Sequence, residues 1–406
     1  MKKTKRCEKM QGQKESRIKN RLSVVCVLSA FVFCAMLFAG AADGAIPDTA
    51  YSDRLYAIRS SQTPLGVCAE TEDEVGGSEY TAKLFGVIPA KDIKSAMRSD
   101  FYVVPCGDAF GVKFFTKGVV VTDLSDVESD EGIICPAKKA GLKTGDVIVK
   151  IDGNEINTVE EMGKAVSENK KGTMNIEFVR DDKNYKAKLL PVKSSSDGNY
   201  KAGMWVRDST AGIGTITFYN PEDGSFAGLG HGIYDADTGL LLPLLKGAVV
   251  DISITDVVKG RNGFPGEIKG NFSDVKTGSL TGNTACGVFG FLNKAPKTVY
   301  EKMQCAVKSE VETGDAVILC NVDGKGICEY KIKIEKIYSG EEPTKNFVIE
   351  VCDDKLLAKT GGIVRGMSGS PISQNGKLVG AVTHVLVSDS KKGYGIFIEN
   401  MLYASE

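Results

Sequence analysis

The chain has 406 residues, of which 42% are hydrophobic, so it is long enough to form two or three domains with packed cores. It carries 51 Lys and Arg residues against 52 Asp and Glu residues, and nothing in this balance points to nucleic-acid binding. The sequence contains only two histidines, His231 and His384. A structural zinc site is therefore not expected, and no metal or other cofactor is predicted.

The first 42 residues have the layout of a membrane anchor. Residues 1–21 hold nine basic side chains against Glu8 and Glu15, and residues 22–42 hold no charged side chain. A helix of that length rises about 30 Å, which is the thickness of the hydrocarbon core of a bilayer. We predict a cytoplasmic basic segment at 1–21 and a transmembrane anchor at 22–42, with the rest of the chain exported. A cleaved signal peptide is the alternative, because residues 39–45 are rich in small side chains.

Residues 105–192 combine short apolar runs with helical patterns. Pro136 suits the first position of a short helix, and Thr158 with Glu161 suits a capping box at the start of a longer one. The segment PAKKAGLKTGDVI within 135–166 resembles the PDZ fold. That resemblance implies a peptide or protein ligand that adds a strand beside the longer helix. It also places the loop that receives a terminal carboxylate at Phe110, Gly111, Val112 and Lys113.

Three further segments complete the predicted domain organisation. Residues 43–104 have mixed character and are interpreted as a stalk and pre-PDZ segment. Residues 193–200 form a polar linker that contains a glycine. Residues 201–406 contain many short apolar runs separated by Gly, Asn and Asp, which is typical of a mostly β domain.

The stretch TGGIVRGMSGSPISQNGKLVGAVTHVLV at 360–387 has the features of a nucleophile loop. Ser368 would attack a carbonyl carbon, and the N–H groups of Gly366 and Ser368 would form the oxyanion hole. Taken alone, Gly-x-Ser-Gly also occurs in ordinary tight turns. Ser370 is a weaker candidate because Pro371 follows it directly.

The loop and the strand after it carry a family resemblance. GMSGSP, the hairpin signal Asn375-Gly376 and GKLVGAVTH resemble the serine loop and return strand of chymotrypsin-like peptidases. TGGIVRGMSGSP together with the upstream GHGI is similar to the SpoIVB peptidase family of spore-forming bacteria. The implied fold is mostly β: an N-terminal transmembrane helix, a PDZ domain, then a chymotrypsin-like double β-barrel serine peptidase domain. The return strand would line the substrate cleft with Thr383, His384 and Val385.

Histidine is the side chain suited to accept and return a proton near neutral pH. His231 lies in a GHG motif and precedes Ser368, as in the chymotrypsin order of catalytic residues. In the SpoIVB family the same motif carries the charge-relay histidine, so we assign His231 as the base. The alternatives are an exposed turn histidine, or a metal ligand together with Asp235 and Asp237.

The orienting acid is assigned from the resemblance, which puts Asp353 at the position of the third relay residue. From the residues alone, Asp251 competes because it lies in an apolar run after His231, and Asp354 is also a candidate. A Ser–Lys dyad through Lys377 or Lys391 has no supporting motif.

The resemblance implies a membrane-anchored serine endopeptidase that acts during sporulation, between the forespore and mother-cell membranes. It would cleave a membrane-bound regulatory protein, trigger sigma-K processing, and undergo autocleavage near its N-terminus. One alternative is a non-catalytic membrane-anchored PDZ scaffold. Another is a general HtrA-like envelope protease, in which the PDZ domain follows the peptidase domain.

Overall fold

The computed structural model divides the chain into two compact units, residues 1–98 and 99–406. The predicted basic segment and anchor, 1–42, lie outside the residues that the structure describes, and no helix among the described residues is long and apolar enough to cross a membrane. The described residues are 49–51, 67–70, 79–84, 88–96, 101–169, 172–338 and 342–405.

The first unit contains one four-stranded sheet with the order β1-β4-β3-β2. It lies within the segment predicted as a stalk, so part of that segment is a folded sheet. Its strands are β1 (Thr49–Tyr51), β2 (Val67–Glu70), β3 (Glu79–Leu84) and β4 (Ile88–Ala96).

The second unit contains a first closed barrel of antiparallel strands, in which β6 pairs with β15, β15 with β16, β16 with β19, β19 with β18, β18 with β17, and β17 with β6 again. Buried aromatic side chains such as Phe110, Phe114 and Phe226 fill it. The strands are β6 (Ala109–Leu124), β15 (Met204–Tyr219), β16 (Ser225–Gly228), β17 (Leu244–Val258), β18 (Glu267–Thr284) and β19 (Gly287–Leu292).

A second closed barrel follows, with the pairing order β21-β22-β23-β26-β25-β24 and back to β21. Its core includes Ile318, Phe347 and Ile372, each 0% exposed. The strands are β21 (Gly314–Cys320), β22 (Cys328–Ile337), β23 (Phe347–Val351), β24 (Pro371–Gln374), β25 (Lys377–Leu386) and β26 (Asp389–Phe397). The helical segments are η1 (Lys308–Glu310), α5 (Asp354–Thr360) and α6 (Ile398–Ala404).

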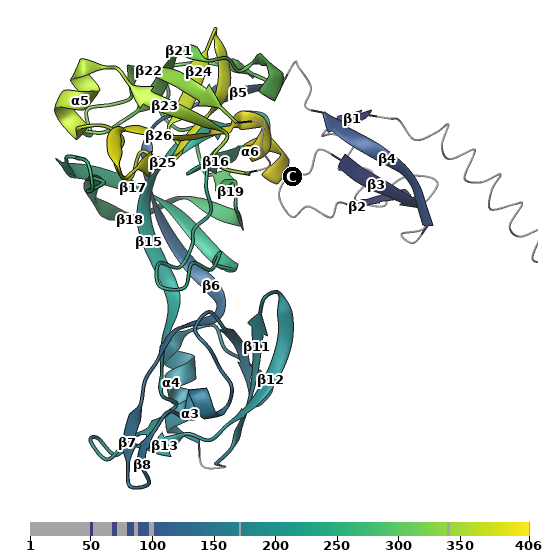
Figure 1. Cartoon of the computed structure of the whole chain (residues 1–406), viewed down its shortest axis with the longest axis vertical. Helices are drawn as coiled ribbons and strands as arrows, with labels where there is room; N and C mark the ends of the chain where they lie inside the picture. Colours follow the sequence, from purple (N-terminus) through teal and green to yellow (C-terminus); the bar gives the residue numbers. More distant parts are fainter. Residues whose placement is uncertain are drawn as a thin grey trace, which may run out of the picture. The chain divides into compact units, whose positions relative to one another are not determined.

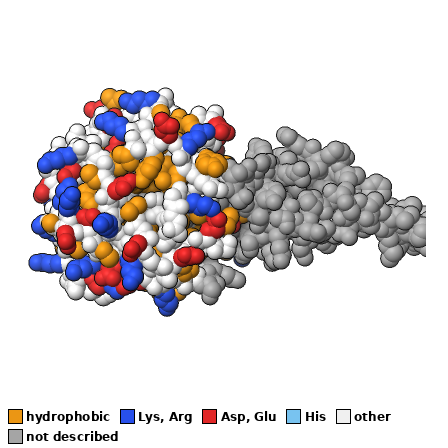
Figure 2. Space-filling model, turned by 90° about the horizontal axis from the view of Figure 1, so that it is seen from above, with side chains coloured by type: hydrophobic (Ala, Val, Ile, Leu, Met, Phe, Trp, Pro, Cys, Tyr) orange, Lys and Arg blue, Asp and Glu red, His pale blue; other side chains and the backbone are white. Residues whose placement is uncertain are grey.

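Two short strands connect the barrels. β5 (Tyr102–Pro105) pairs with β15 of the first barrel and with β20 (Met303–Cys305), and β20 pairs with β25 of the second barrel. The predicted double β-barrel is therefore present. Figure 2 shows basic and acidic side chains intermixed over one face of this unit, in keeping with the balanced charge of the sequence.

The PDZ region lies between β6 and β15 in the sequence. Both predicted helix starts are confirmed: Pro136 opens α3, and Thr158 and Glu161 form the capping box of α4. Its separate core packs α4 against strands β9 and β11. The elements are β7 (Val127–Ser129), β8 (Gly132–Ile134), α3 (Pro136–Lys139), β9 (Val147–Ile151), β10 (Asn154–Glu155), α4 (Val159–Ser167), β11 (Met174–Arg180), β12 (Lys183–Leu189), β13 (Val192–Lys193) and β14 (Tyr200–Lys201).

The long strands β6 and β15 pair along most of their length and run from the first barrel into the PDZ region, as Figure 1 shows. The PDZ region is thus an insertion between two adjacent strands of the first barrel. This differs from the predicted division, in which the PDZ domain at 105–192 ends before the peptidase domain begins at 201.

The predicted carboxylate-binding loop is wrong. Phe110 pairs with β15, while Gly111, Val112 and Lys113 pair with β15 on one side and with β17 on the other. A strand that is hydrogen-bonded on both edges has no free N–H groups for a peptide. The alternation of apolar residues in this stretch identified a buried strand, but it did not tell which sheet the strand joins.

Candidate active site

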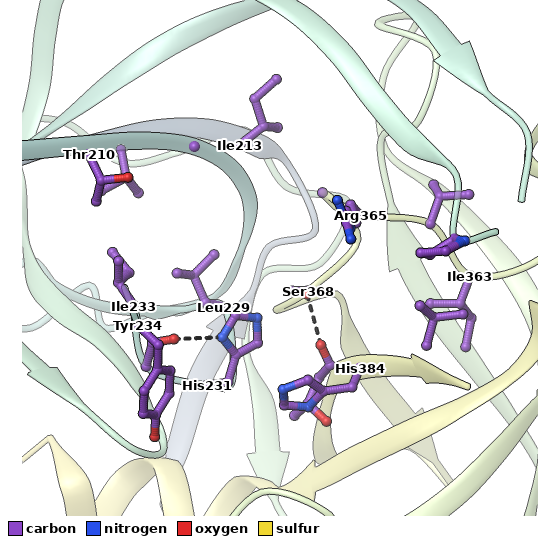
Figure 3. Close-up of a pocket in the computed structure, with 18 of the residues that line it drawn as sticks. Thr210, Ile213, Leu229, His231, Ile233, Tyr234, Ile363, Arg365, Ser368 and His384 are labelled. Carbon is purple, nitrogen blue, oxygen red and sulfur yellow. Dashed lines mark hydrogen bonds between the residues drawn. The ribbon is translucent and has the colours of Figure 1, made fainter. Parts of the chain in front are cut away.

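One pocket of about 430 Å³ contains Ser368, His231 and His384 together (Figure 3). The first barrel contributes residues such as Ile213, and the second contributes Ile363 and its neighbours. The predicted cleft residues Thr383, His384 and Val385 also line this pocket. A serine hydroxyl and imidazole rings from distant parts of the chain therefore face one apolar cavity, which is the setting for nucleophilic catalysis.

Strand β15 holds the loop that carries Ser368. The Thr215 N–H donates to the Ser368 carbonyl at 2.9 Å, and the Thr215 hydroxyl donates to the Gly366 carbonyl at 2.8 Å. Two residues on, the Thr217 hydroxyl donates to the Gly369 carbonyl at 2.8 Å. The sequence analysis missed both threonines. Their signal was two polar residues at alternate positions of the otherwise apolar stretch 213–219, which places both on one face of the sheet.

Gly369 allows this loop to approach the backbone that leads to His231. A Cβ atom at Gly369 would lie 2.1 Å from the Thr215 carbonyl oxygen and 2.5 Å from the Leu229 nitrogen. Its φ of +95° is also in the region that favours glycine. Any larger residue here would push the Ser368 loop away from the His231 turn.

The His231 ring is oriented by its own turn. Leu229, two residues before His231, has a φ of +68°, which is unusual for a residue with a side chain. His231 Nδ1 lies 2.8 Å from the Gly232 carbonyl oxygen (Figure 3). A carbonyl only accepts, so Nδ1 carries the proton and Nε2 keeps its lone pair. Burial lowers the pKa of His231, against the opposing effect of that hydrogen bond, so the ring is neutral at pH 7 and can act as a base.

The Ser368 hydroxyl points elsewhere in this conformation. It donates to the Thr383 carbonyl at 2.8 Å (Figure 3). The second histidine, His384, lies beside the first, with 4.9 Å between ring centroids. Burial, and then repulsion from His231 and Lys345, lowers the pKa of His384 to about 4. His384 is therefore neutral under most conditions and adds no charge to the pocket.

The predicted oxyanion donors are available. Gly366 has a φ of +101°, and its preceding carbonyl, that of Arg365, accepts the Ile268 N–H at 2.9 Å. Among the described residues, neither the Gly366 N–H nor the Ser368 N–H donates a hydrogen bond. Backbone donors without an acceptor beside a nucleophile are what an oxyanion hole requires.

Two models of known protein families match this chain, and one of them covers the residues of this pocket from 210 to 387. The family model "SpoIVB peptidase S55" matches residues 198–402, and the PDZ domain model matches residues 97–190. The chain belongs to the SpoIVB peptidase S55 family. This family member is a serine endopeptidase that carries a PDZ domain.

Peptidases and a PDZ domain are among the solved structures to which the chain is similar. The PDZ domain of the SdrC-like protein from Listeria monocytogenes is 28% identical, over 22% of this chain and 87% of that chain, with a TM-score of 0.18. The Rv3671c protease from M. tuberculosis, in its active form, is 14% identical over 48% and 72%, with a TM-score of 0.26. An HtrA-type protease solved with a tripeptide is 12% identical over 47% and 54%, with a TM-score of 0.29.

Among the described residues of this S55 peptidase, no carboxylate is hydrogen-bonded to His231. Asp353 is the N-cap of α5, where one carboxylate oxygen accepts the N–H groups of Lys355 at 2.9 Å and Leu356 at 3.1 Å. Asp251 and Asp354 are exposed, and neither lines the pocket. The described lining residues include Arg365 but no carboxylate. Neither the contacts of Asp353 nor those of His231 therefore support an orienting role for Asp353.

The remaining candidates lie outside the pocket. Ser370 is fully buried and does not line it, and Lys377 forms an ion pair with Glu310. Asp235 and Asp237 both form ion pairs with Arg207. Within the described part of the chain, no group of three or more His, Cys, Asp or Glu side chains could hold a metal.

A second cavity, of about 640 Å³, lies in the PDZ region. It is bordered by Val159, Met162 and Val166 of α4 and by the first residues of β15, Met204 to Val206. In a PDZ domain the peptide lies between this helix and a strand. The start of β15, rather than Phe110 to Lys113, occupies that position beside α4.

Proposed function

We propose that this protein is a membrane-anchored endopeptidase in which Ser368 attacks the peptide carbonyl. His231 Nε2 takes the hydroxyl proton and returns it to the leaving amine, and the N–H groups of Gly366 and Ser368 bind the oxyanion. The observation that carries the proposal is the presence of both side chains and both donors at one pocket.

Catalysis requires the Ser368 hydroxyl to leave its present hydrogen-bond acceptor, the Thr383 carbonyl, and to donate to His231 Nε2 instead. That exchange gives up one hydrogen bond, which contributes about 1 kcal/mol, and gains another. The conformation described here is therefore a resting state close in energy to the reactive one. We propose that bound substrate favours the exchange, because the hydroxyl must turn toward the carbonyl that it attacks.

The Gly232 carbonyl takes the place of an orienting acid in this proposal. It fixes the same tautomer that a carboxylate would fix, because both accept the Nδ1 proton. A neutral carbonyl stabilises the imidazolium less than a charged acceptor does. We therefore expect a slow peptidase, which suits an enzyme that cuts a regulator once rather than degrading many chains.

We further propose that the substrate is a membrane-bound regulatory protein and that its cleavage triggers sigma-K processing during spore formation. Membership of the SpoIVB family supports this role. The uncharged stretch 22–42 supports membrane attachment, with the catalytic domain between the forespore and mother-cell membranes. The groove beside α4 supports capture of a peptide or protein ligand. We also propose that autocleavage near the N-terminus releases the active part.

The test replaces Ser368 with alanine in a spore-forming host and follows the sigma-K precursor by immunoblot. The precursor should persist in Ser368→Ala cells and disappear in cells with Ser370→Ala, the matched control outside the pocket. Normal processing in Ser368→Ala cells would contradict the proposal.

The bond from the Ser368 hydroxyl to the Thr383 carbonyl favours a second candidate, a non-catalytic PDZ scaffold, and so does the lack of a carboxylate among the described lining residues. Under that alternative, Ser368→Ala cells process the precursor normally. A change in the α4 groove such as Met162→Glu would then block processing instead.

A further inference from the structure

Thr215 contacts both loops of the active site through three separate groups. Its N–H donates to the Ser368 carbonyl at 2.9 Å, and its carbonyl accepts the Leu229 N–H at 3.2 Å. Its hydroxyl donates to the Gly366 carbonyl at 2.8 Å. The side chain is 1% exposed, so no water competes for these bonds. One residue of the first barrel thus joins the nucleophile loop to the His231 turn.

The Gly366 carbonyl is a sensitive point for this arrangement. A glycine rotates freely about φ and ψ, so the peptide planes on either side of Gly366 need external restraint. The Ile268 N–H holds the plane before Gly366 through the Arg365 carbonyl. The Thr215 hydroxyl holds the plane after it through the Gly366 carbonyl, and the Met367 N–H of the same plane donates to the Val364 carbonyl at 3.1 Å. The Gly366 N–H belongs to the peptide before Gly366 and the Ser368 N–H to the peptide after Met367, so the planar Gly366–Met367 peptide between them sets their relative direction.

Resting on the proposed function, we propose that the Thr215 hydroxyl is a positioning group for the oxyanion hole. It keeps the Gly366–Met367 peptide in place, so that the Gly366 and Ser368 N–H groups converge on one oxygen. Without the hydroxyl, the buried Gly366 carbonyl has lost its donor, and the loop gains by rotating to find another. Thr215 itself does not touch the substrate.

Thr217 provides an internal comparison. Its hydroxyl also binds a loop carbonyl, that of Gly369. The peptide that contains this carbonyl lies after Ser368 and carries the Ser370 N–H, which donates to the Met367 carbonyl at 2.9 Å, so it does not lie between the two oxyanion donors. Loss of the Thr217 hydroxyl should therefore disturb the oxyanion hole less than loss of the Thr215 hydroxyl.

The experiment measures the rate at which a fluorophosphonate labels the full chain. Thr215→Val keeps the branched shape and removes the hydroxyl, and Thr215→Ser keeps the hydroxyl. Thr116→Val is the matched control, because Thr116 is also buried and donates to a backbone carbonyl, that of Gly118, away from the pocket. Thermal melting of each variant reports the structural cost separately.

We expect Thr215→Val to slow labelling by about 10- to 100-fold, less than the 10²–10³ that follows loss of an oxyanion donor itself. Thr215→Ser and Thr116→Val should both be labelled at close to the wild-type rate. The melting temperature should fall in Thr116→Val as it does in Thr215→Val. A peptide boronate, which mimics the tetrahedral state, should lose affinity for Thr215→Val by a similar factor.

Labelling of Thr215→Val at the rate of Thr116→Val would overturn the proposal. If Thr215→Val does not fold, the pair Thr215→Ala and Thr215→Ser, which differs by one oxygen atom, decides instead, and equal rates in that pair overturn the proposal. A wild-type chain that is not labelled at all would overturn the proposed peptidase function, and this inference with it. A labelled wild type with no effect at Thr215 would overturn this inference alone.

Discussion

The two catalytic loops are held in different ways. The Ser368 loop is bound from both barrels, by Thr215 and Ile268 of the first and by Val382 of the second. The His231 ring has one hydrogen-bond partner among the described residues, the carbonyl of the residue that follows it. The fold thus presets the backbone of the nucleophile loop and its oxyanion donors, whereas the ring of the base depends on a local turn. Variants of the first loop should therefore affect chemistry most, and variants around the base should reveal what orients it.

The largest effect is expected at Ser368. Replacement by alanine removes the nucleophile and should lower kcat/KM on a peptide substrate by up to about 10⁶-fold. Ser370→Ala should leave most activity, because Ser370 lies outside the pocket. Equal losses in the two variants would mean that the loop as a whole, rather than one hydroxyl, is being measured.

The next largest effect is expected at His231. Variants of the two histidines distinguish the role of His231 from that of His384. His231→Ala should lower kcat/KM by a factor comparable to the loss of the serine, because the two act as a unit. His384→Gln should cost less than about tenfold and act mainly on KM, because His384 lines the cleft. A larger loss in His384→Gln than in His231→Ala would mean that His384, rather than His231, is the base.

The pH dependence of kcat/KM reports the state of the base. His231 must be neutral to accept a proton, so activity falls as pH falls through its pKa. Since burial lowers that pKa, the acid limb should have its midpoint below 6.5. A midpoint above 6.5 would indicate a carboxylate beside the ring in the working enzyme, because a nearby negative charge raises the pKa of a histidine.

The smallest effect on activity is expected at Asp353. This variant tests most directly whether the His231 ring is oriented by its own turn alone. As the N-cap of α5, Asp353 should contribute about 1 kcal/mol to stability, which Asp353→Ala loses in urea unfolding. Its kcat/KM should change by less than about tenfold. A fall near 10⁴, as in a triad that loses its acid, would show that Asp353 reaches His231 during catalysis.

Local patterns predicted the parts of the fold whose signals are contiguous. The capping box of Thr158 and Glu161 and the opening Pro136 gave the PDZ helices, and GMSGSP with GHG gave two residues that meet in one pocket. Asp353 had a local signal as well, since an aspartate before a helical run is a typical N-cap.

Pairings between distant residues were not predictable in this way. β6 and β15 are separated by the whole PDZ region, and no feature of the residues near Phe110 reveals that β15 and β17 flank them. The role of Thr215 likewise depends on contacts with residues more than a hundred positions away. Such contacts follow from strand register, which the sequence alone leaves open.

The central claim is that the Ser368 hydroxyl is activated by His231. The direct measurement labels the full chain with a fluorophosphonate, maps the adduct by mass spectrometry, and repeats the rate measurement in His231→Ala. The account predicts an adduct on Ser368 that forms at least 100-fold more slowly in the variant. An adduct on another residue, or an unchanged rate in His231→Ala, would contradict it.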